Sequence, residues 1–436
     1  MYLNELKNKS ITVLGLGLSG MSTVRFLARN NLAFRVIDSR EFPPNAAEAQ
    51  KLASSYHFGD LADADLANCD VLIISPGLPL ANPHVQEVIA KGVEVIGDVE
   101  LFARINTKPV YAVTGSNGKS SVVTLASKVL TEAGFSVALA GNIGTPVLDV
   151  VDGEYDCFVL ELSSFQLETT YSLKCKASCV LNLSEDHMDR YESLTSYQQA
   201  KLAIHRNSER VVINQDDTLT HYKHALVTSF GLKQADYYLA DQYFMHHDKV
   251  LCSVDQLSVL GTHNQLNALA VMALLDDLAL EKTVFIRTFK HFHGLPHRCQ
   301  LVVEVDGVKY INDSKATNVG ATVAAIRSLA NDKNIILIAG GVGKGADFTE
   351  LQVDIERSVK KLIVFGQDAK LIAKLEQSAE SVDSLEQAVK MAKASAVKGD
   401  LVLFAPACAS FDMFKSFEHR GDVFIDCVNH EVQACQ

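Results

Sequence analysis

The segment VYAVTGSNGKSS, residues 110–121, reads as a strand, a glycine loop and the start of a helix. Its first four residues are apolar, and the apolar positions beyond the loop recur at helical spacing. The N–H groups of such a loop cradle phosphates, while Lys119 meets the charge of the β- and γ-phosphates and Ser120 can reach Mg²⁺. The loop departs from the common G-x-x-x-x-G-K-[ST] pattern because residue 113 is valine. The candidate ATP-binding residues of the loop are Gly115, Ser116, Asn117, Gly118, Lys119, Ser120 and Ser121.

A second glycine loop, GLGLSG at residues 15–20, also lies between a predicted strand and a predicted helix. The next predicted strand ends at Asp38. The G-x-G-x-x-G spacing lets a diphosphate approach a helix N-terminus, but glycine there also serves helix–strand packing alone. The motif favours a diphosphate-type ligand without identifying the nucleotide.

Apolar runs of strand length alternate with helical patterns along the whole chain, which is typical of α/β folds with parallel sheets. The pattern restarts after residues 106–109 and after residues 293–298. A chain of 436 residues exceeds the ~250–300 residues at which a single core stops growing. We therefore predict three α/β domains, at residues 1–97, 98–294 and 295–436.

Composition excludes several classes of protein. With 40 Lys+Arg against 52 Asp+Glu the net charge is −12, which argues against non-specific nucleic-acid binding. No segment has the 18 or more apolar residues of a membrane span, and the N-terminus lacks an apolar core of signal-peptide length. The nine cysteines form no Cys-x-x-Cys pair, and their odd number indicates reduced thiols. We expect a cytoplasmic protein that binds neither nucleic acid nor membrane.

Polar residues that end apolar strands are the first candidates for a site, because ligands of doubly wound sheets lie beyond the carboxyl ends of the strands. Glu161 and Asn142 each end a predicted strand, and Asp186 and His187 follow a third. Carboxylate oxygen suits Mg²⁺, so Glu161 is a natural ligand and His187 an unusual one, but their clustering favours a site. The pattern around Lys201 predicts only a solvated helix lysine.

The third predicted domain carries two lysines and two hydroxyls at strand ends. Lys315, Lys344, Thr317 and Ser410 all follow predicted strands, and together they suit a small acidic substrate. At any one position, capping of the following helix is an equally good explanation for a hydroxyl. The recurrence of such residues at several strand ends favours a site.

Taken together, these motifs resemble those of the Mur ligase family over essentially the full length of the chain. The resemblance is carried by residues 115–120, 161–167, 185–191, 263–267, 295–298, 312–318 and 405–421. It implies an N-terminal Rossmann-like domain for a UDP-sugar, a central P-loop-type ATPase domain with a mainly parallel sheet, and a C-terminal Rossmann-like domain for an amino acid. It also implies ATP-dependent ligation of D-glutamate to UDP-N-acetylmuramoyl-L-alanine through an acyl phosphate, in cytoplasmic peptidoglycan precursor synthesis by a monomer.

The resemblance further implies roles for individual residues. It places Lys119, His187, Lys201, Glu161 and Asn142 in catalysis, and two Mg²⁺ ions on Ser120, Glu161, His187 and Lys201, the last as a carbamate. It assigns Asn264, Arg298, Asp313 and Lys315 to ATP, in addition to the loop at 115–121. It assigns Leu18, Ser19, Asp38, Ser39, Gly77, Asn142 and His187 to the UDP-substrate, and Thr317, Lys344, Ser410 and Phe417 to D-glutamate. A carbamate converts a lysine cation into a hard oxygen ligand, which explains a lysine beside metal ions.

Three alternatives remain open. A sister Mur ligase or a folylpolyglutamate synthase-like ligase is the rival within the same class, although residues 408–421 and the N-terminal domain favour D-glutamate addition. An NAD-dependent oxidoreductase is suggested by residues 15–20 alone and leaves the loop at 114–121 unexplained. A non-catalytic nucleotide-binding regulator is weakened by the presence of every expected catalytic position.

Overall fold

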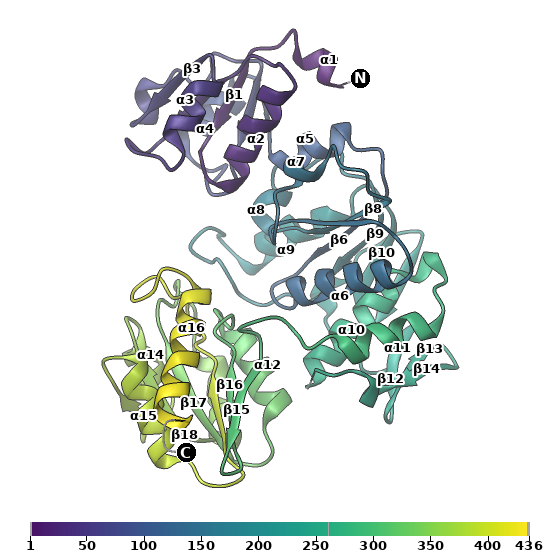
Figure 1. The fold of residues 1–436 in the computed structure, drawn as a ribbon. Coiled ribbons are helices and arrows are strands. Elements are labelled where there is room, and N and C mark those ends of the chain that lie inside the picture. The colour runs from purple at the N-terminus through teal and green to yellow at the C-terminus, as the bar shows by residue number, and fades with distance from the viewer. Residues whose placement is uncertain (1, 260, 434–436) are drawn as a thin grey trace. The chain divides into compact units, whose positions relative to one another are not determined.

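The computed structural model describes residues 2–259 and 261–433, in which three sheets are each flanked by helices (Figure 1). The chain divides into two compact units. The first comprises Met1–Leu183, Thr195–Cys252 and Ala268–Thr288, and the second comprises Ser184–Leu194, Ser253–Asn267 and Phe289–Gln436. The three α/β segments expected from the sequence are confirmed as three separate sheets.

Residues 2–97 contain a five-stranded parallel sheet in the order β3-β2-β1-β4-β5. The chain reverses its winding direction between β1 and β4, which is the point where ligands of such folds bind. The central strands β1 and β4 are entirely buried, as in a parallel sheet with helices on both faces, whereas the edge strand β3 is partly exposed. The strands are β1 Ile11–Leu14, β2 Arg35–Asp38, β3 Ser55–Phe58, β4 Val71–Ile74 and β5 Glu94–Ile96, and the helices are α1 Tyr2–Leu6, α2 Leu18–Arg29, α3 Ala46–Leu52 and α4 Pro83–Ala90.

The glycine loop between β1 and α2 needs glycine for close packing. A Cβ atom at residue 20 would lie 1.8 Å from the carbonyl oxygen of Gly15, and Gly15 itself has φ +93°. Gly17, in contrast, has open space around its Cα. The third glycine of the motif therefore serves helix–strand packing, while the second leaves the loop accessible.

Residues 98–259 and 261–294 contain a nine-stranded sheet in the order β14-β13-β12-β11-β10-β9-β6-β8-β7. The pairs from β7 to β12 are parallel and the β12–β13 pair is antiparallel, which confirms a mainly parallel sheet. The strands are β6 Val110–Thr114, β7 Val137–Gly141, β8 Cys157–Glu161, β9 Cys175–Val180, β10 Ser208–Asn214, β11 Val227–Phe230, β12 Tyr237–Ala240, β13 Tyr243–His246 and β14 Lys249–Ser253. The helices are α5 Asp98–Ile105, α6 Lys119–Glu132, α7 Val147–Val150, α8 Ser164–Leu167, α9 Leu194–Leu202, α10 Thr262–Leu274 and α11 Lys282–His291.

Strand β9 differs from its prediction. The apolar run at 179–183 predicts a strand there, but β9 spans Cys175–Val180. Hydropathy misses its first half because Lys176 is polar, yet the side chain of Lys176 forms an ion pair of 2.7 Å with Glu209 on the neighbouring strand β10. Residues 181–183 consequently form a loop at the carboxyl edge of the sheet.

Residues 295–433 contain a six-stranded sheet in the order β15-β16-β20-β17-β18-β19, in which only the β15–β16 pair is antiparallel. Alternate residues of β17 face opposite cores: Ile335 and Leu337 pack with α12–α14, and Ile336 and Ile338 pack with α15 and α16. The strands are β15 Gln300–Val305, β16 Val308–Asn312, β17 Ile335–Gly340, β18 Val359–Phe365, β19 Glu380–Ser381 and β20 Leu401–Phe404. The helices are α12 Val319–Leu329, α13 Gln352–Ser358, α14 Ala369–Ala373, α15 Leu385–Ser395 and α16 Phe417–Val428.

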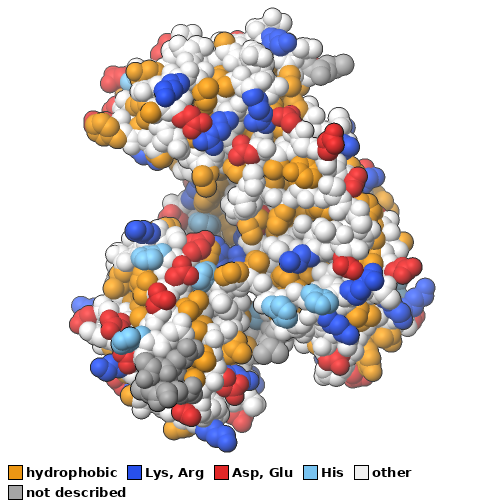
Figure 2. Space-filling model, in the orientation of Figure 1, with side chains coloured by type: hydrophobic (Ala, Val, Ile, Leu, Met, Phe, Trp, Pro, Cys, Tyr) orange, Lys and Arg blue, Asp and Glu red, His pale blue; other side chains and the backbone are white. Residues whose placement is uncertain are grey.

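The surface carries both signs of charge. On the face drawn in Figure 2, Lys and Arg side chains alternate with Asp and Glu side chains rather than gathering by sign. The cysteines of residues 2–433 that the structure describes are free thiols, and Cys435 lies outside the described residues. No helix within those residues is long and apolar enough to cross a membrane.

Candidate functional site

The carboxyl edge of the N-terminal sheet gathers candidate residues from three strands. The buried carboxylate of Asp38, at the end of β2, accepts the N–H of Leu16 at 2.7 Å and pairs with Arg40 at 2.6 Å. Burial raises the pKa of Asp38, but the hydrogen bonds from Arg40 and Leu16 outweigh burial and lower it. Asp38 therefore fixes the glycine loop and also orients Arg40, a cation beside Ser39 that the sequence analysis did not select.

Ser19 is tied to a buried acid at the start of α5. Its hydroxyl favours the charged form of the carboxylate of Asp98, a residue that is only 2% exposed. The Oδ2 atom of Asp98 has no hydrogen-bond partner among the described residues. Burial therefore raises the pKa of Asp98 to about 6, although Ser19 and nearby backbone N–H groups act to lower it.

We expect Asp98→Asn to stabilise the protein at neutral pH and to change little below about pH 4. The acid has a pKa of 3.8 when unperturbed and about 6 in the folded state, so folding favours the protonated form and stability falls as pH rises between these values. Such a difference corresponds to roughly 3 kcal/mol, and the neutral amide does not incur it. Thermal unfolding of both proteins at pH 5 and pH 7.5 checks this, and a gap in melting temperature that does not widen with pH would contradict it.

The loop between β6 and α6 has the geometry expected of a phosphate-binding loop. Gly115 and Gly118 have φ values of +149° and +84°, which side chains rarely tolerate. Lys119 begins α6 and its Nζ donates to the carbonyl oxygens of Gly115 at 2.7 Å and Ser116 at 3.0 Å. The lysine ammonium therefore lies over the loop, where phosphate oxygens would be bound.

Asn182, which follows β9, holds this loop in place. Its carbonyl oxygen accepts the N–H of Ser116 at 2.8 Å, and its side chain exchanges two hydrogen bonds with the backbone of Asn117, at 2.9 and 3.0 Å. The sequence analysis did not select Asn182. The signal was present, because an amide interrupts the apolar run Leu181-Asn182-Leu183 just past a strand.

Lys201 is not the solvated helix lysine that the pattern predicts. It is 2% exposed, and its Nζ donates to the carbonyl oxygen of Gly115 at 2.9 Å. Tyr197, four residues earlier on α9, shares the same helix face and bonds the hydroxyl of Ser116 at 3.2 Å. The pattern was misleading because lysine counts as polar even where it points into a site. Since Lys119 also bonds Gly115, two ammonium groups flank one carbonyl and concentrate positive charge.

Glu161 and Asn142 meet at the ends of β8 and β7. The side chain of Asn142 donates to Oε1 of Glu161 at 2.7 Å. Glu161 is 2% exposed, and its Oε2 is buried without a hydrogen-bond partner among the described residues. A Cβ at residue 141, where φ is +109°, would lie 2.2 Å from the carbonyl oxygen of Glu161, so glycine allows the two strands to approach.

The donor set around Glu161 fits a hard cation. A buried carboxylate oxygen that lacks a protein donor is costly unless a cation binds it, and Mg²⁺ takes few protein ligands together with water and phosphate oxygens. Within residues 2–259 and 261–433, no three His, Cys, Asp or Glu side chains are grouped as a metal site. The candidates in the first unit are therefore Glu161, the hydroxyl of Ser120 and, if modified, Lys201.

The second unit holds the remaining nucleotide candidates. Asp313 follows β16 and accepts the N–H of Cys299 at 3.2 Å and its thiol at 3.4 Å. Burial raises the pKa of Asp313 to about 6, although these bonds and the charge of Arg298 oppose the rise. The ammonium of Lys315 lies 4.0 Å from the centre of the Phe417 ring. Asn264 lies in the first turn of α10.

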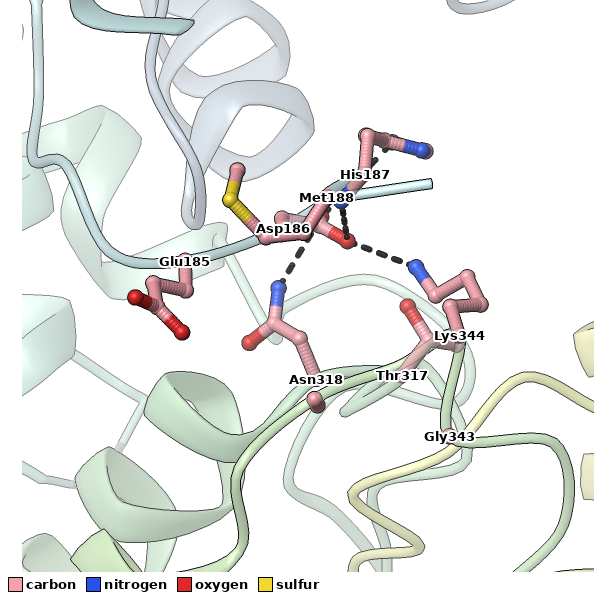
Figure 3. Close-up of a pocket in the computed structure, with 9 residues that line it drawn as sticks. Glu185, Asp186, His187, Met188, Thr317, Asn318, Gly343 and Lys344 are labelled. Carbon is pink, nitrogen blue, oxygen red and sulfur yellow. Dashed lines mark hydrogen bonds and ion pairs between the residues drawn. The ribbon is translucent and has the colours of Figure 1, made fainter. Parts of the chain in front are cut away.

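A small pocket in the second unit contains three of the residues that the sequence analysis selected, namely His187, Thr317 and Lys344 (Figure 3). The Nζ of Lys344 pairs with Oδ1 of Asp186 at 2.6 Å, and the amide of Asn318 donates to Oδ2 at 3.1 Å. Burial raises the pKa of Asp186, but the charges of Lys344 and His187 and these bonds lower it to about 2. The pocket is lined by Glu185, Asp186, His187, Met188, Thr317, Asn318, Gly343, Lys344 and Ala346.

Arg420 supports the loops that carry Ser410 and Phe417. Its buried guanidinium donates to both oxygens of Ser314 and to the carbonyl oxygen of Cys408, at 2.8–3.1 Å. The hydroxyl of Ser314 donates in turn to the carbonyl oxygen of Phe417 at 2.9 Å. Burial lowers the pKa of Arg420 to about 10. The sequence analysis named no role for Arg420, although its spacing on α16 places it on the apolar face.

The candidate residues thus fall into two groups. The first unit contains Leu18, Ser19, Asp38, Ser39, Gly77, the loop at 115–121, Asn142, Glu161 and Lys201, and the second contains His187, Asn264, Arg298, Asp313, Lys315, Thr317, Lys344, Ser410 and Phe417. Most of these residues lie at the carboxyl ends of strands or in the loops that follow them, whereas Lys201 and Asn264 lie on helices α9 and α10 and Arg298 precedes β15.

Three family models match the chain in order. A Mur ligase MurD-like N-terminal domain matches residues 9–97, a Mur ligase middle domain matches residues 113–275, and a Mur ligase glutamate ligase domain matches residues 297–408. Among relatives, the UDP-N-acetylmuramoylalanine--D-glutamate ligase of Pseudoalteromonas translucida is 52% identical over 99% of both chains. The enzyme of that name from Haemophilus ducreyi is 44% identical over 97% of this chain and 98% of its own.

Solved structures share the fold at lower identity. The UDP-N-acetylmuramate-alanine ligase MurC of Thermotoga maritima is 21% identical, covers 98% of this chain and 100% of its own, and has a TM-score of 0.60. A bifunctional folylpolyglutamate synthase/dihydrofolate synthase is 17% identical, covers 75% of this chain and 91% of its own, and has a TM-score of 0.57. At these identities the likeness establishes the three-domain fold alone.

Proposed function

The chain belongs to the Mur ligase family, and from that membership we propose that it joins D-glutamate to UDP-N-acetylmuramoyl-L-alanine with conversion of ATP to ADP and phosphate. The observation that carries the proposal is the 52% identity, over 99% of both chains, to a relative that bears this activity in its name. The family resemblance expected from the sequence motifs is confirmed. A sister ligase or a folylpolyglutamate synthase is not favoured, because those structures resemble the chain at only 17–21% identity.

The chemistry follows from the weakness of a carboxylate as an electrophile. The γ-phosphoryl group of ATP moves to an oxygen of the substrate's terminal carboxylate, which releases ADP and leaves an acyl phosphate. The amine of D-glutamate then attacks the acyl carbon, and the tetrahedral intermediate collapses with cleavage of the C–O bond to phosphate. One C–N bond forms, inorganic phosphate leaves, and the amine loses a proton.

The phosphate loop and its two lysines fit the first half-reaction. Phosphoryl transfer depends on positioning and on charge stabilisation, and Lys119 and Lys201 already direct their Nζ atoms at Gly115. Magnesium would neutralise phosphate charge there, held by Ser120 and by the unpaired oxygen of Glu161. We further propose a second ion, with His187 and a carbamylated Lys201 as ligands.

The remaining assignments are proposals of the same kind. We assign residues 1–97 to the UDP-substrate, with Leu18, Ser19, Asp38, Ser39 and Gly77 as contacts and Asn142 toward the muramoyl group. We assign residues 98–294 to ATP and residues 295–436 to D-glutamate, through Thr317, Lys344, Ser410 and the backbone at Phe417, while Asn264, Arg298, Asp313 and Lys315 contact the nucleotide. We also propose a monomer that works in the cytoplasm, where its thiols stay reduced.

The decisive experiment measures phosphate release from ATP with UDP-N-acetylmuramoyl-L-alanine and a panel of amino acids. We expect turnover with D-glutamate and none with L-lysine, meso-diaminopimelate or L-alanine. Turnover with L-lysine or meso-diaminopimelate but not with D-glutamate would show that the chain has the activity of a different Mur ligase. Binding of a nicotinamide nucleotide without ATP turnover would instead favour an oxidoreductase.

A further inference from the structure

The carboxylate of Asp186 organises the cationic side of the amino-acid pocket. Its Oδ1 lies 2.6 Å from the Nζ of Lys344, and its Oδ2 accepts the side-chain amide of Asn318 at 3.1 Å. Figure 3 shows the Asp186 side chain between these two groups, beside His187 on the same stretch of chain. Asp186 therefore contacts a residue already assigned to D-glutamate, although it has no assigned role itself.

The Asp186–Lys344 pair is shielded enough to fix a flexible side chain. The two side chains are 10% and 20% exposed, and a partly buried ion pair with a charge-assisted hydrogen bond holds its geometry far better than a surface pair does. A lysine on its own has a long stem with many rotamers, and ordering it on ligand binding costs free energy. An ammonium has three N–H donors, so the pair with Asp186 leaves donors for a ligand carboxylate.

Asp186 is also coupled to the backbone of the next residue. The N–H of His187 donates to Oδ1 of Asp186 at 3.0 Å, and His187 adopts a left-handed conformation with φ +58°. Non-glycine residues rarely hold such a conformation without support from their surroundings. The same carboxylate oxygen thus bonds Lys344 and the backbone that orients His187.

We propose that Asp186 is a positioning residue of the amino-acid site, which holds the ammonium of Lys344 and the amide of Asn318 ready for a carboxylate of D-glutamate and links them to His187. The inference rests on the proposed function. Asp186 acts through Lys344 and does not itself contact the substrate carboxylate, because two negative groups would repel each other. Its removal therefore weakens amino-acid binding specifically.

The test is steady-state kinetics of Asp186→Asn, which keeps the size of the side chain and removes its charge. We expect the KM for D-glutamate to rise about tenfold or more, while the KM values for ATP and the UDP-substrate change less than about twofold. Asp186→Glu should recover part of the loss, because it restores the carboxylate. An unchanged KM for D-glutamate would overturn the proposal, and a lower one would show that Asp186 competes with the substrate for Lys344.

A double-mutant cycle with Lys344→Met tests the route of action. If Asp186 acts through Lys344, adding Asp186→Asn to Lys344→Met should lower kcat/KM for D-glutamate by less than about twofold further. Full additivity of the two effects would overturn the coupling.

Asp189→Asn serves as the matched control, because it makes the same chemical change on the same segment at an exposed residue outside the pocket. We expect its KM for D-glutamate to stay within about twofold of the unsubstituted value. An equal rise of the KM for D-glutamate in Asp189→Asn would show that the effect comes from the net charge of this stretch of chain, and it would overturn the proposal. Failure of the unsubstituted enzyme to use D-glutamate at all would instead reject the proposed function, so the two failures are distinguishable.

Discussion

Lys119→Ala should abolish ATP-dependent ligation, with a fall in kcat of about 10²–10³-fold or more. The ammonium lies over the phosphate loop, 2.7 Å from the carbonyl oxygen of Gly115, and alanine leaves the charge of the transferring phosphoryl group without this cation. Binding of the UDP-substrate should be largely intact, because its proposed contacts such as Asp38 lie on a different sheet. Phosphate release and isothermal titration with the UDP-substrate measure the two effects separately.

Lys128→Ala is the control for this experiment. Lys128 lies on the same helix, α6, is exposed to solvent, and is replaced by the same residue. Lys128→Ala should leave kcat within about twofold of the unsubstituted value. A fall in kcat that occurs only in Lys119→Ala then supports a role of Lys119 at the phosphates. Retained turnover in Lys119→Ala would argue against that role.

Lys201→Ala should also lose ligation activity, by about 10²-fold or more, and short carboxylates such as formate or acetate should restore part of it. The reason is chemical: a carbamate on Lys201 would present carboxylate-like oxygens to a metal ion, and a free carboxylate can occupy the space that the shortened side chain leaves. Lys201 is almost fully buried against the loop, so the vacated space is confined. Initial rates over a range of carboxylate concentrations measure the rescue.

Lys119→Ala provides the control for rescue. Its lost group is a cation, so the same carboxylates should restore nothing. Recovery of Lys119→Ala to the same degree would show a general salt effect. A folded Lys201→Ala variant that no carboxylate restores would speak against the carbamate.

The fold was largely predictable, because the strongest signals in this sequence are local. Three sheets were predicted from two strand-loop-helix patterns, with loops at residues 15–20 and 114–121, and from the new start of the pattern after residues 293–298. The structure contains all three sheets. The features that could not be predicted depend on contacts between residues that are far apart in the sequence. Strand β9 begins at Cys175, which pairs with Ser208 of β10, and the hydropathy of residues 175–178 alone does not reveal that neighbouring strand.

The candidate site was predictable where chemistry and strand ends coincide, as at Glu161. It was not predictable where a side chain's role depends on burial. By pattern Lys201 is a surface lysine, yet the structure buries it against Gly115, and only the family resemblance singled it out. Arg420 received no role for the same reason, and Asp186 was noted only as a residue after a strand, since the loops that each side chain holds together come from distant parts of the chain.

The close approach of strands β7 and β8 limits which substitutions this enzyme tolerates at residue 141. Residue 141 has no side chain, yet any substitution there would push a Cβ to within 2.2 Å of the main-chain oxygen of Glu161 and displace the carboxylate next to it. A variant selected to evade an inhibitor bound at that carboxylate cannot arise at residue 141 without also damaging the enzyme. Residue 141 pairs with Glu161 across two parallel strands, so this position is closed to such variants and resistance would have to arise elsewhere in the chain.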